Sequence, residues 1–242
     1  MDNKFSMEFT VGLHDAGPGG VIKIPVLFGY LQAAAGAHAN SLNFGSADIL
    51  LKGYTWVISR YRLSIIKLPK FLDTFILTTW RASVDEKYSI RESLITDTSS
   101  NVLIRVTSSW ILLNFIKKIS VPANELYPNY PTNPERAIDD KFLPIPEVLH
   151  SHNNKEFVVR KYDLDMNNHV NNSIYAAYVI EAGEDMNEGK KLKDISLNFK
   201  GEVRYGDTII SEAMNDNDGR MIHRLKSKNT GKEITRAITE WE

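Results

Sequence analysis

The sequence predicts an α+β protein made of two copies of one unit, each with a helix followed by antiparallel strands. Three observations support this prediction. A polar loop leads into an apolar helical stretch twice, at residues 13–39 and 161–184. Several runs rich in β-branched and aromatic residues follow each helix. A proline-rich segment separates the two copies.

Composition excludes several classes of protein. The chain has 242 residues, 43% of them hydrophobic, with a formal net charge of −1 and no cysteine. Without cysteine there is no disulfide, thiolate metal site or cysteine nucleophile. The balanced charge argues against nucleic-acid binding, and no window reaches 18 uninterrupted apolar residues. We expect a cytoplasmic protein with no membrane insertion, no cleaved leader, and no metal or other cofactor.

The proline-rich segment sets the expected domain boundaries. Residues 126–154 hold five of the nine prolines together with several asparagines, which is typical of an extended connector. We therefore predict an N-terminal domain at residues 1–125, a linker at residues 126–154 and a C-terminal domain at residues 155–242.

Four pairs of residues recur in the same order in the two halves and indicate an internal duplication. The helix regions align if two residues are inserted in the front loop. The pairs are Asp15 with Asp165, Tyr30 with Tyr178, Asp73 with Asp207, and Trp110 with Trp241.

The same number of strands is expected after each helix. In the front half the expected strands cover residues 54–66, 74–84, 88–96 and 102–114, and in the back half residues 195–205, 208–214, 221–227 and 233–241. The helical stretch at residues 174–180 is apolar all round, so we expect a sheet to enclose it. Small residues at 33–37 either allow close packing in the front half or leave room for an apolar ligand.

The strongest candidate for chemistry is the polar loop before the second helix. Asp165, Asn167 and His169 are two residues apart, and Asn171 or Asn172 is placed to cap the helix that follows. A carboxylate, an amide and an imidazole at a helix N-terminus provide a base for water and donors for an oxyanion. The alternative is a turn that only caps a helix.

These residues resemble a known family. The string DLDMNNHVNNSIYAAYVIE at residues 163–181, together with YLQAAAGAHA in the front half, resembles the acyl-ACP thioesterases and, more loosely, the hot-dog-fold thioesterases. The resemblance covers nearly the whole chain. It implies a tandem (double) hot-dog fold, in which each unit is a long central helix wrapped by an antiparallel β-sheet. It also implies hydrolysis of fatty acyl-ACP to free fatty acid and holo-ACP.

The resemblance implies catalytic roles for Asp165, Asn167 and His169, and for Glu202 in the segment LNFKGEV. Strand alternation places Glu202 on a polar face, unless a bulge at Gly201 turns it inward. Water would attack the thioester directly or after formation of an acyl-carboxylate anhydride. Which of the two carboxylates is the base or nucleophile stays open.

The front half lacks the polar cluster, and Leu68 stands where Glu202 would be. We therefore expect one active site per chain and a front unit that shapes the acyl pocket. The expected pocket residues are Ala34, His38, Trp56 and Trp80. Chain-length preference is not deducible from them.

The expected partner is acidic acyl carrier protein. The first candidate docking surface carries Arg60, Arg62, Lys67 and Lys70, and a second basic cluster carries Lys190, Lys191 and Lys193. The alternatives are an acyl-CoA thioesterase of the same fold and a non-catalytic acyl-binding protein. A hot-dog dehydratase is disfavoured by the spacing of Asp165 and His169. The oligomeric state, including a homodimer, stays open.

Overall fold

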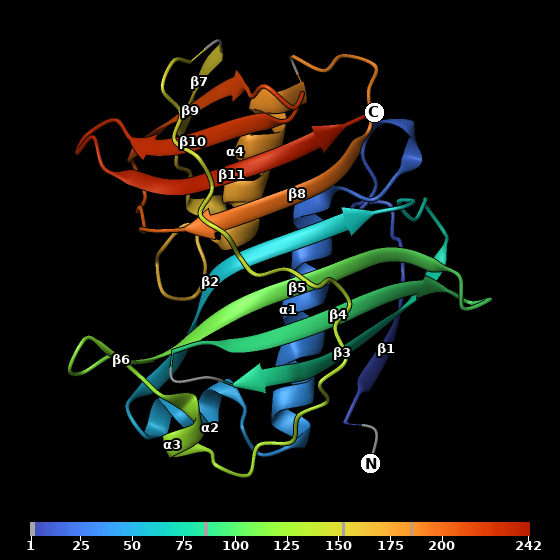
Figure 1. Ribbon diagram of the computed structural model, residues 1–242, viewed down its shortest axis with the longest axis vertical. Coiled ribbons are helices and arrows are strands. Elements are labelled where there is room, and N and C mark those ends of the chain that lie inside the picture. The colour runs from blue at the N-terminus through green and yellow to red at the C-terminus, as the bar shows by residue number, and fades with distance from the viewer. Residues whose placement is uncertain (1–2, 85–86, 152, 185) are drawn as a thin grey trace. The chain divides into compact units, whose positions relative to one another are not determined.

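The structure is a computed structural model that describes residues 3–84, 87–151, 153–184 and 186–242. The chain divides into two compact units, unit 1 at Met1–Lys141 and unit 2 at Phe142–Glu242 (Figure 1). Each unit is described by itself below. No helix among the described residues is long and apolar enough to cross a membrane.

Unit 1 is an antiparallel sheet with one long helix. The strand order is β1-β3-β4-β5-β2, and the short β6 pairs with β5. The helices are α1 (Ile24–Ser41), α2 (Ser46–Leu51) and α3 (Ala123–Leu126). The strands are β1 (Phe5–Thr10), β2 (Tyr54–Ile65), β3 (Thr74–Val84), β4 (Ser89–Asp97), β5 (Val102–Asn114) and β6 (Ile119–Val121).

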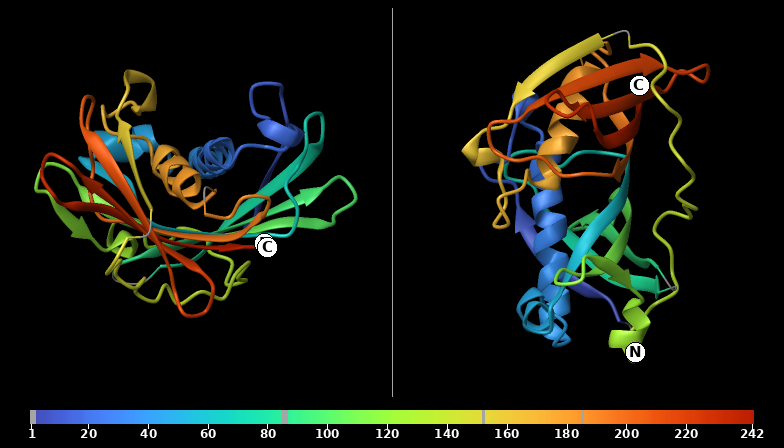
Figure 2. Two further views of the ribbon diagram at one scale, coloured as in Figure 1. Left: turned by 90° about the horizontal axis from the view of Figure 1, so that it is seen from above. Right: turned by 90° about the vertical axis from the view of Figure 1, so that its left-hand side faces the viewer.

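Helix α1 begins with Pro25 in its first turn, where the missing N–H costs no hydrogen bond. Its buried residues recur at helical spacing and form one face: Ile24, Leu27, Phe28, Leu31, Ala34, Ala35 and His38. The strands of unit 1 curve around this helix (Figure 2). Burial of this face is what holds α1 against the sheet.

Unit 2 repeats the topology of unit 1 with shorter elements. Its strand order is β8-β11-β10-β9-β7, which corresponds strand for strand to β2-β5-β4-β3-β1. The elements are β7 (Asn153–Val158), α4 (Asn172–Glu184), β8 (Leu192–Phe199), β9 (Thr208–Asn215), β10 (Met221–Ser227) and β11 (Glu233–Trp241). A matching strand order in both units supports the internal duplication.

Helix α4 packs closely on its sheet. Its buried residues include Tyr175, Tyr178 and Gly183, and it contacts β7, β9, β10 and β11. A Cβ on Gly183 would lie 3.0 Å from the ring of Trp241 and 3.2 Å from that of His223. The helix therefore reaches the sheet at a point where only glycine fits without a shift.

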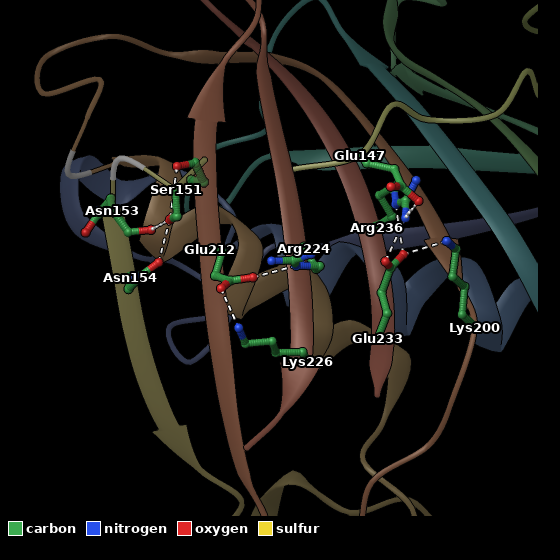
Figure 3. Close-up of polar contacts among 11 residues, drawn as sticks. Glu147, Ser151, Asn153, Asn154, Lys200, Glu212, Arg224, Lys226, Glu233 and Arg236 are labelled. Atoms are coloured by element: carbon green, nitrogen blue, oxygen red, sulfur yellow. Dashed lines mark hydrogen bonds and ion pairs between the residues drawn. The ribbon is translucent and has the colours of Figure 1, made fainter. Parts of the chain in front are cut away.

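The outer face of the unit 2 sheet carries several ion pairs (Figure 3). Glu212 lies in an ion pair with Arg224 at 2.5 Å and with Lys226 at 2.6 Å. Arg236 pairs with Glu233 at 2.7 Å and also contacts Glu147 of the segment before β7 at 3.1 Å. Part of the proline-rich segment therefore lies over the outer face of β11.

The elements depart from the expected ones at a few places. Residues 127–151 form no helix or strand, and residue 152 of the predicted linker lies outside the described residues. The strand expected at residues 195–205 ends at Phe199. The short helices α2 and α3 and the strands β1, β6 and β7 add to the expected set.

Candidate active site

The loop before α4 is a closed, hydrogen-bonded turn. Leu164 and Val170 form an antiparallel bridge at its base. Inside the bridge, the N–H of Asp165 donates to the carbonyl of His169 at 2.7 Å, and the N–H of Asn168 donates to the carbonyl of Asp165 at 3.1 Å. Asn168 has φ +61°, a left-handed conformation that asparagine tolerates. The loop thus presents its side chains from a fixed backbone.

The Asp165 carboxylate is oriented by this backbone. Its Oδ1 accepts the N–H of Asn167 at 2.8 Å and that of His169 at 3.2 Å. Its Oδ2 has no hydrogen-bond partner in the described part of the chain, and the residue is half-buried. One carboxylate oxygen is therefore held in place while the other remains able to bind water or substrate.

Glu202 lies next to the His169 imidazole. Their Nδ1 and Oε2 atoms are 3.3 Å apart, with 24% and 61% of the two side chains exposed. The chain leaves strand β8 here, because Lys200 and Gly201 both donate to the carbonyl of Ile234, at 2.8 and 3.1 Å. Two consecutive N–H groups on one carbonyl is the pattern of a β-bulge. The strand alternation that assigned Glu202 to a polar face ends before this residue.

Asn171 caps α4, which decides between the two candidate caps. Its Oδ1 accepts the N–H of Ser173 at 3.0 Å and the hydroxyl of the same residue at 2.9 Å. The carbonyl of Asn171 accepts the N–H of Ile174 at 2.9 Å. Two of the first N–H groups of the helix are therefore bonded. The side chain of Asn167 is exposed, so its amide is able to donate to a substrate carbonyl.

Tyr175, on the first turn of α4, ties the loop to the Glu202 segment. It is 1% exposed, and its hydroxyl accepts the N–H of Val203 at 3.2 Å. The carbonyl of Val203 accepts the N–H of Val170 at 3.1 Å. Burial raises the pKa of Tyr175, and the charges of Glu202 and Asp165 raise it further. No local sequence pattern indicates this role, because the partner of Tyr175 is a backbone group.

Asp163 fixes the other end of the loop. It is 0% exposed, its carboxylate pairs with Arg160 at 2.8 Å, and it accepts the hydroxyl of Tyr178 at 3.3 Å. Burial alone would raise the pKa of Asp163, but the hydrogen bonds from Arg160 outweigh it and lower the pKa. The carbonyl of Asp163 also accepts the N–H of the cap residue Asn171, at 2.9 Å. Sequence reasoning missed this residue.

Unit 1 has the same aspartate–tyrosine pair. Asp15 accepts the hydroxyl of Tyr30 at 2.7 Å, and both pairs span 15 residues. Asp15 therefore corresponds to Asp163, and the alignment of Asp15 with Asp165 was wrong. No insertion in the front loop is needed.

The front loop also has two of the backbone hydrogen bonds of the loop before α4, although Gly19 has φ +72° where its counterpart Asn167 has no positive φ. The N–H of Gly17 donates to the carbonyl of Val21 at 2.8 Å, and the N–H of Gly20 donates to the carbonyl of Gly17 at 3.0 Å. Gly20 has φ +73°, as its counterpart Asn168 has φ +61°. In this register Gly17, Gly19 and Val21 stand where unit 2 has Asp165, Asn167 and His169. Unit 1 thus builds the loop without its polar side chains.

The bulge recurs in unit 1 as well. Ile66 and Lys67 both donate to the carbonyl of Leu103, at 2.9 and 3.1 Å. Lys67 stands where unit 2 has Gly201, so the bulge does not require glycine. The residues that follow differ: unit 1 has Leu68 and Pro69, whereas unit 2 has Glu202 and Val203. The position of Tyr175 is Leu27 in unit 1.

The structure does not bring all four expected pocket residues together. Ala34 and His38 lie four residues apart on the buried face of α1. Trp56 lies on β2, packed against a cluster that includes Tyr127 and Tyr130. Trp80 is buried on the opposite face of the sheet, where its indole N–H donates to the carbonyl of Glu135 at 2.8 Å.

The first predicted docking surface is only partly exposed. Arg60 and Arg62 are half-buried on β2, and Arg62 forms an ion pair with Asp140 at 3.2 Å. Lys67 and Lys70 are exposed. In the second cluster, Lys190 and Lys191 are exposed and Lys193 pairs with Glu242 at 2.6 Å.

Two carboxylates, an amide and an imidazole thus gather at the start of α4, all from unit 2. No group of three metal-binding side chains occurs in the part of the chain that is described. A base oriented by hydrogen bonds, an imidazole beside a carboxylate and a free amide donor suit acid–base addition of water to a carbonyl. A carboxylate base, an imidazole and amide donors at a helix N-terminus are the groups that a hydrolase of acyl compounds requires.

Comparisons with known proteins agree with this class. Residues 2–128 match the acyl-ACP thioesterase N-terminal domain and residues 147–242 match the acyl-ACP thioesterase C-terminal domain. The chain belongs to the acyl-ACP thioesterase family and is a thioester hydrolase.

Individual relatives are distant but match nearly the whole of this chain. An oleoyl-acyl carrier protein thioesterase of Arabidopsis thaliana, a chloroplastic protein, is 25% identical over 98% of this chain and 75% of its own. The crystal structure of an acyl-ACP thioesterase from Bacteroides thetaiotaomicron superimposes with a TM-score of 0.90 at 20% identity, covering 100% of this chain and 98% of that chain. The 12:0-ACP thioesterase from Umbellularia californica gives 0.85 at 23% identity, with the same coverage.

Proposed function

We propose that this thioesterase cleaves fatty acyl-ACP at the loop that precedes α4, releasing free fatty acid and holo-ACP. One observation carries the assignment of the site. Both units form the loop and the bulge, but only unit 2 carries the polar cluster there, namely Asp165, Asn167, His169 and Glu202. Family membership supports the reaction, and this difference between the units supports its location at the loop before α4.

In the proposed reaction a water molecule attacks the thioester carbonyl carbon. Asp165, through its unbonded Oδ2, takes the proton of that water, and the amide of Asn167 donates to the carbonyl oxygen as negative charge develops there. Glu202 orients the His169 imidazole, which delivers a proton to the departing sulfur as the C–S bond breaks. The helix dipole of α4 adds a favourable field. Attack by Asp165 itself, through an acyl-carboxylate anhydride, uses the same geometry and remains the second route.

The proposed architecture is a tandem hot-dog fold, one unit to each half of the chain. The boundaries we propose are those of the sequence: an N-terminal domain at residues 1–125, a linker at residues 126–154 and a catalytic domain at residues 155–242. The shared strand order and the single long helix in each unit support the tandem architecture. In this proposal unit 1 provides the acyl pocket and no chemistry.

The proposed partner is acyl carrier protein, which is acidic. Lys67 and Lys70 are the exposed members of the basic surface that we expect to steer it, and such steering weakens as salt is added. If carrier binding does not change with added salt, this surface does not steer the carrier. We propose a cytoplasmic location, to be checked by cell fractionation, and leave homodimer formation to sedimentation of the purified chain.

The test of the site is release of fatty acid from purified acyl-ACP. We expect Asp165→Asn and His169→Ala each to lower kcat by roughly 10²-fold or more, because positioned acid–base groups contribute about 10²–10⁴-fold. Asp15→Asn in unit 1 is the matched control, since it alters an aspartate that lies outside the polar cluster, and it should keep kcat. Retention of more than about a tenth of the wild-type kcat by either unit 2 variant would count against the assigned roles.

The same assay separates the alternatives. An acyl-CoA thioesterase would cleave the CoA thioester as efficiently as the carrier-bound one. A non-catalytic acyl-binding protein would bind acyl-ACP and release no fatty acid. We expect hydrolysis with a higher kcat/KM for acyl-ACP than for acyl-CoA of the same chain.

A further inference from the structure

Unit 1 buries an arginine that has no hydrogen-bond partner. Arg81, on β3, is 2% exposed, and none of its three guanidinium nitrogens is hydrogen-bonded. Its guanidinium carbon lies 4.1 Å from the centre of the Tyr130 ring and 5.9 Å from that of Trp56. Burial lowers the pKa of Arg81 to about 10, which still leaves it charged at neutral pH. Buried charges without partners are costly, so they mark sites of function.

A second arginine lies directly opposite the first. Arg81 and Arg91 are cross-strand partners on β3 and β4. Arg91 contacts His38 at 3.1 Å, the Thr79 hydroxyl at 3.2 Å and the Tyr130 hydroxyl at 3.3 Å. Burial and the charge of Arg91 lower the pKa of His38 to about 4, so at neutral pH every partner of Arg91 is uncharged. Like charges placed opposite each other destabilise a sheet, and here no carboxylate among the described residues offsets them.

The pair faces the helix and not the outer surface of the sheet. Arg91 reaches His38 on α1, and Arg81 is its cross-strand partner, two residues from Thr79 on the same strand face. The corresponding positions in unit 2 are Asn215 and Met221, so the arginine pair is a feature of unit 1.

Elsewhere in unit 1 a buried charge is fully compensated. Glu92, with 0% of its side chain exposed, pairs with Arg136 at 2.6 Å and also accepts the Thr107 hydroxyl at 2.7 Å and the N–H of Ala137 at 3.1 Å. Glu92 is next to Arg91 and points to the other face of the sheet. The buried charge of Glu92 on β4 is therefore compensated by its partners, whereas that of Arg81 on β3 is not.

We propose that Arg81 and Arg91 form a carboxylate-binding site inside unit 1. A guanidinium donates two parallel hydrogen bonds to a carboxylate, and none of the side-chain donors of Arg81 is already used. Aromatic rings flank the site, so the ligand carries its carboxylate on an apolar stem. Because the guanidinium is enclosed, the ligand reaches it when the Tyr130 ring, from a segment with no helix or strand, moves aside.

This inference rests on the proposed function when it names the substrate. In a fatty acyl thioesterase, an acyl chain with a carboxylate at its far end fits this site, whereas a plain alkyl chain leaves the arginines unpaired. The substrate class is thus the thioesters of long dicarboxylic acids. A free fatty acid carries the same group, so the experiments below separate the two sources.

The kinetic experiment compares two acyl-ACP substrates of twelve carbons, one ending in a methyl group and one in a carboxylate. We expect wild type to favour the carboxylate-ended chain by at least 10-fold in kcat/KM and Arg81→Met to lose that preference. Arg105→Met, which changes an exposed arginine of β5, should keep it. Equal rates in wild type, or a preference for the methyl-ended chain, would overturn the proposal. If neither substrate is cleaved, the proposed function fails and the binding experiment decides the site.

The binding experiment needs no activity. Dodecanedioate, dodecanoate and chloride are added separately to wild type and Arg81→Met, and the thermal midpoint is recorded. We expect dodecanedioate to raise the thermal midpoint of the wild type and to leave that of Arg81→Met unchanged. If dodecanoate stabilises the wild type to the same extent, the ligand is a free fatty acid. If only chloride stabilises it, the arginines form a simple anion site. Each of these results would overturn the substrate assignment. Without ligand, Arg81→Met should melt at or above the wild-type midpoint, since it removes an unpaired buried charge.

Discussion

At the residue scale, the two oxygens of the Asp165 carboxylate differ in what they can do. Oδ1 is bonded to two backbone N–H groups of its own loop, and Oδ2 is left for the reacting water. Glu202 has no such constraint, being 61% exposed at its side chain, and lies against His169. In the proposed reaction the two carboxylates therefore take different parts, Asp165 at the water and Glu202 at the imidazole.

Glu202 tests this division. We expect Glu202→Ala to lower kcat by roughly 10²-fold, the low end of acid–base contributions, because the imidazole loses the group that orients it. Glu202→Gln keeps an oxygen beside Nδ1 and should lose less. Steady-state hydrolysis of acyl-ACP by the two variants gives the order. A Gln variant as impaired as the Ala variant would mean that the negative charge, and not the orientation, is what matters.

At the element scale, local sequence patterns predicted most strands and the two long helices. They did not predict which strands pair or where the pairing is interrupted by a bulge. Apolar patterns predicted a helix within each of the stretches 13–39 and 161–184, and turn residues predicted the limits of most strands to within one residue. The short strand β7 is defined by its partner β9, a contact distant in sequence, and so left no local signal. The bulge after Phe199 broke the alternation used to orient Glu202.

The polar loop was predicted as a cluster, but its internal pairing was not. Two aspartates lie two residues apart at 163 and 165, and sequence alone aligned the second with Asp15. The equal separations of Asp15 from Tyr30 and of Asp163 from Tyr178 were visible in the sequence. Their meaning depended on the hydrogen bonds to the tyrosine hydroxyls. Tyr175 was hidden for a related reason, since its partner is an N–H of the main chain.

The hydrogen bond from Val203 to Tyr175 connects α4 to the segment that carries Glu202, and it tests Tyr175 as a positioning residue. We expect Tyr175→Phe to lower kcat about 10-fold and to destabilise the fold by about 1–3 kcal/mol, because a buried N–H loses its acceptor. Unit 1 has Leu27 and Pro69 at these positions, where no N–H needs a partner.

The double variant Tyr175→Phe, Val203→Pro supplies the control. Proline removes the N–H, so the free energy of unfolding should return toward wild type while kcat stays low. Denaturant unfolding and kcat measured on both variants separate positioning from stability. A single variant with unchanged kcat would show that the hydrogen bond does not position Glu202.

At the scale of the whole molecule, one scaffold is used twice. The two units share strand order, loop hydrogen bonds, bulge and aspartate–tyrosine pair, and differ in the side chains that the scaffold presents. Unit 2 presents the polar cluster, and unit 1 presents the buried Arg81 and the half-buried Arg91 in place of Asn215 and Met221. These differences support the proposed division of chemistry and ligand recognition between the two copies.

The most direct test replaces three residues of the unit 2 loop with their unit 1 counterparts. The triple variant Asp165→Gly, Asn167→Gly, His169→Val keeps a loop that the chain already forms at Gly17, Gly19 and Val21. Its kcat for acyl-ACP hydrolysis is measured alongside its circular dichroism and thermal midpoint. We expect a folded protein whose kcat falls by at least about 10²-fold. A folded variant that keeps more than a tenth of the wild-type kcat would show that catalysis does not reside in this loop.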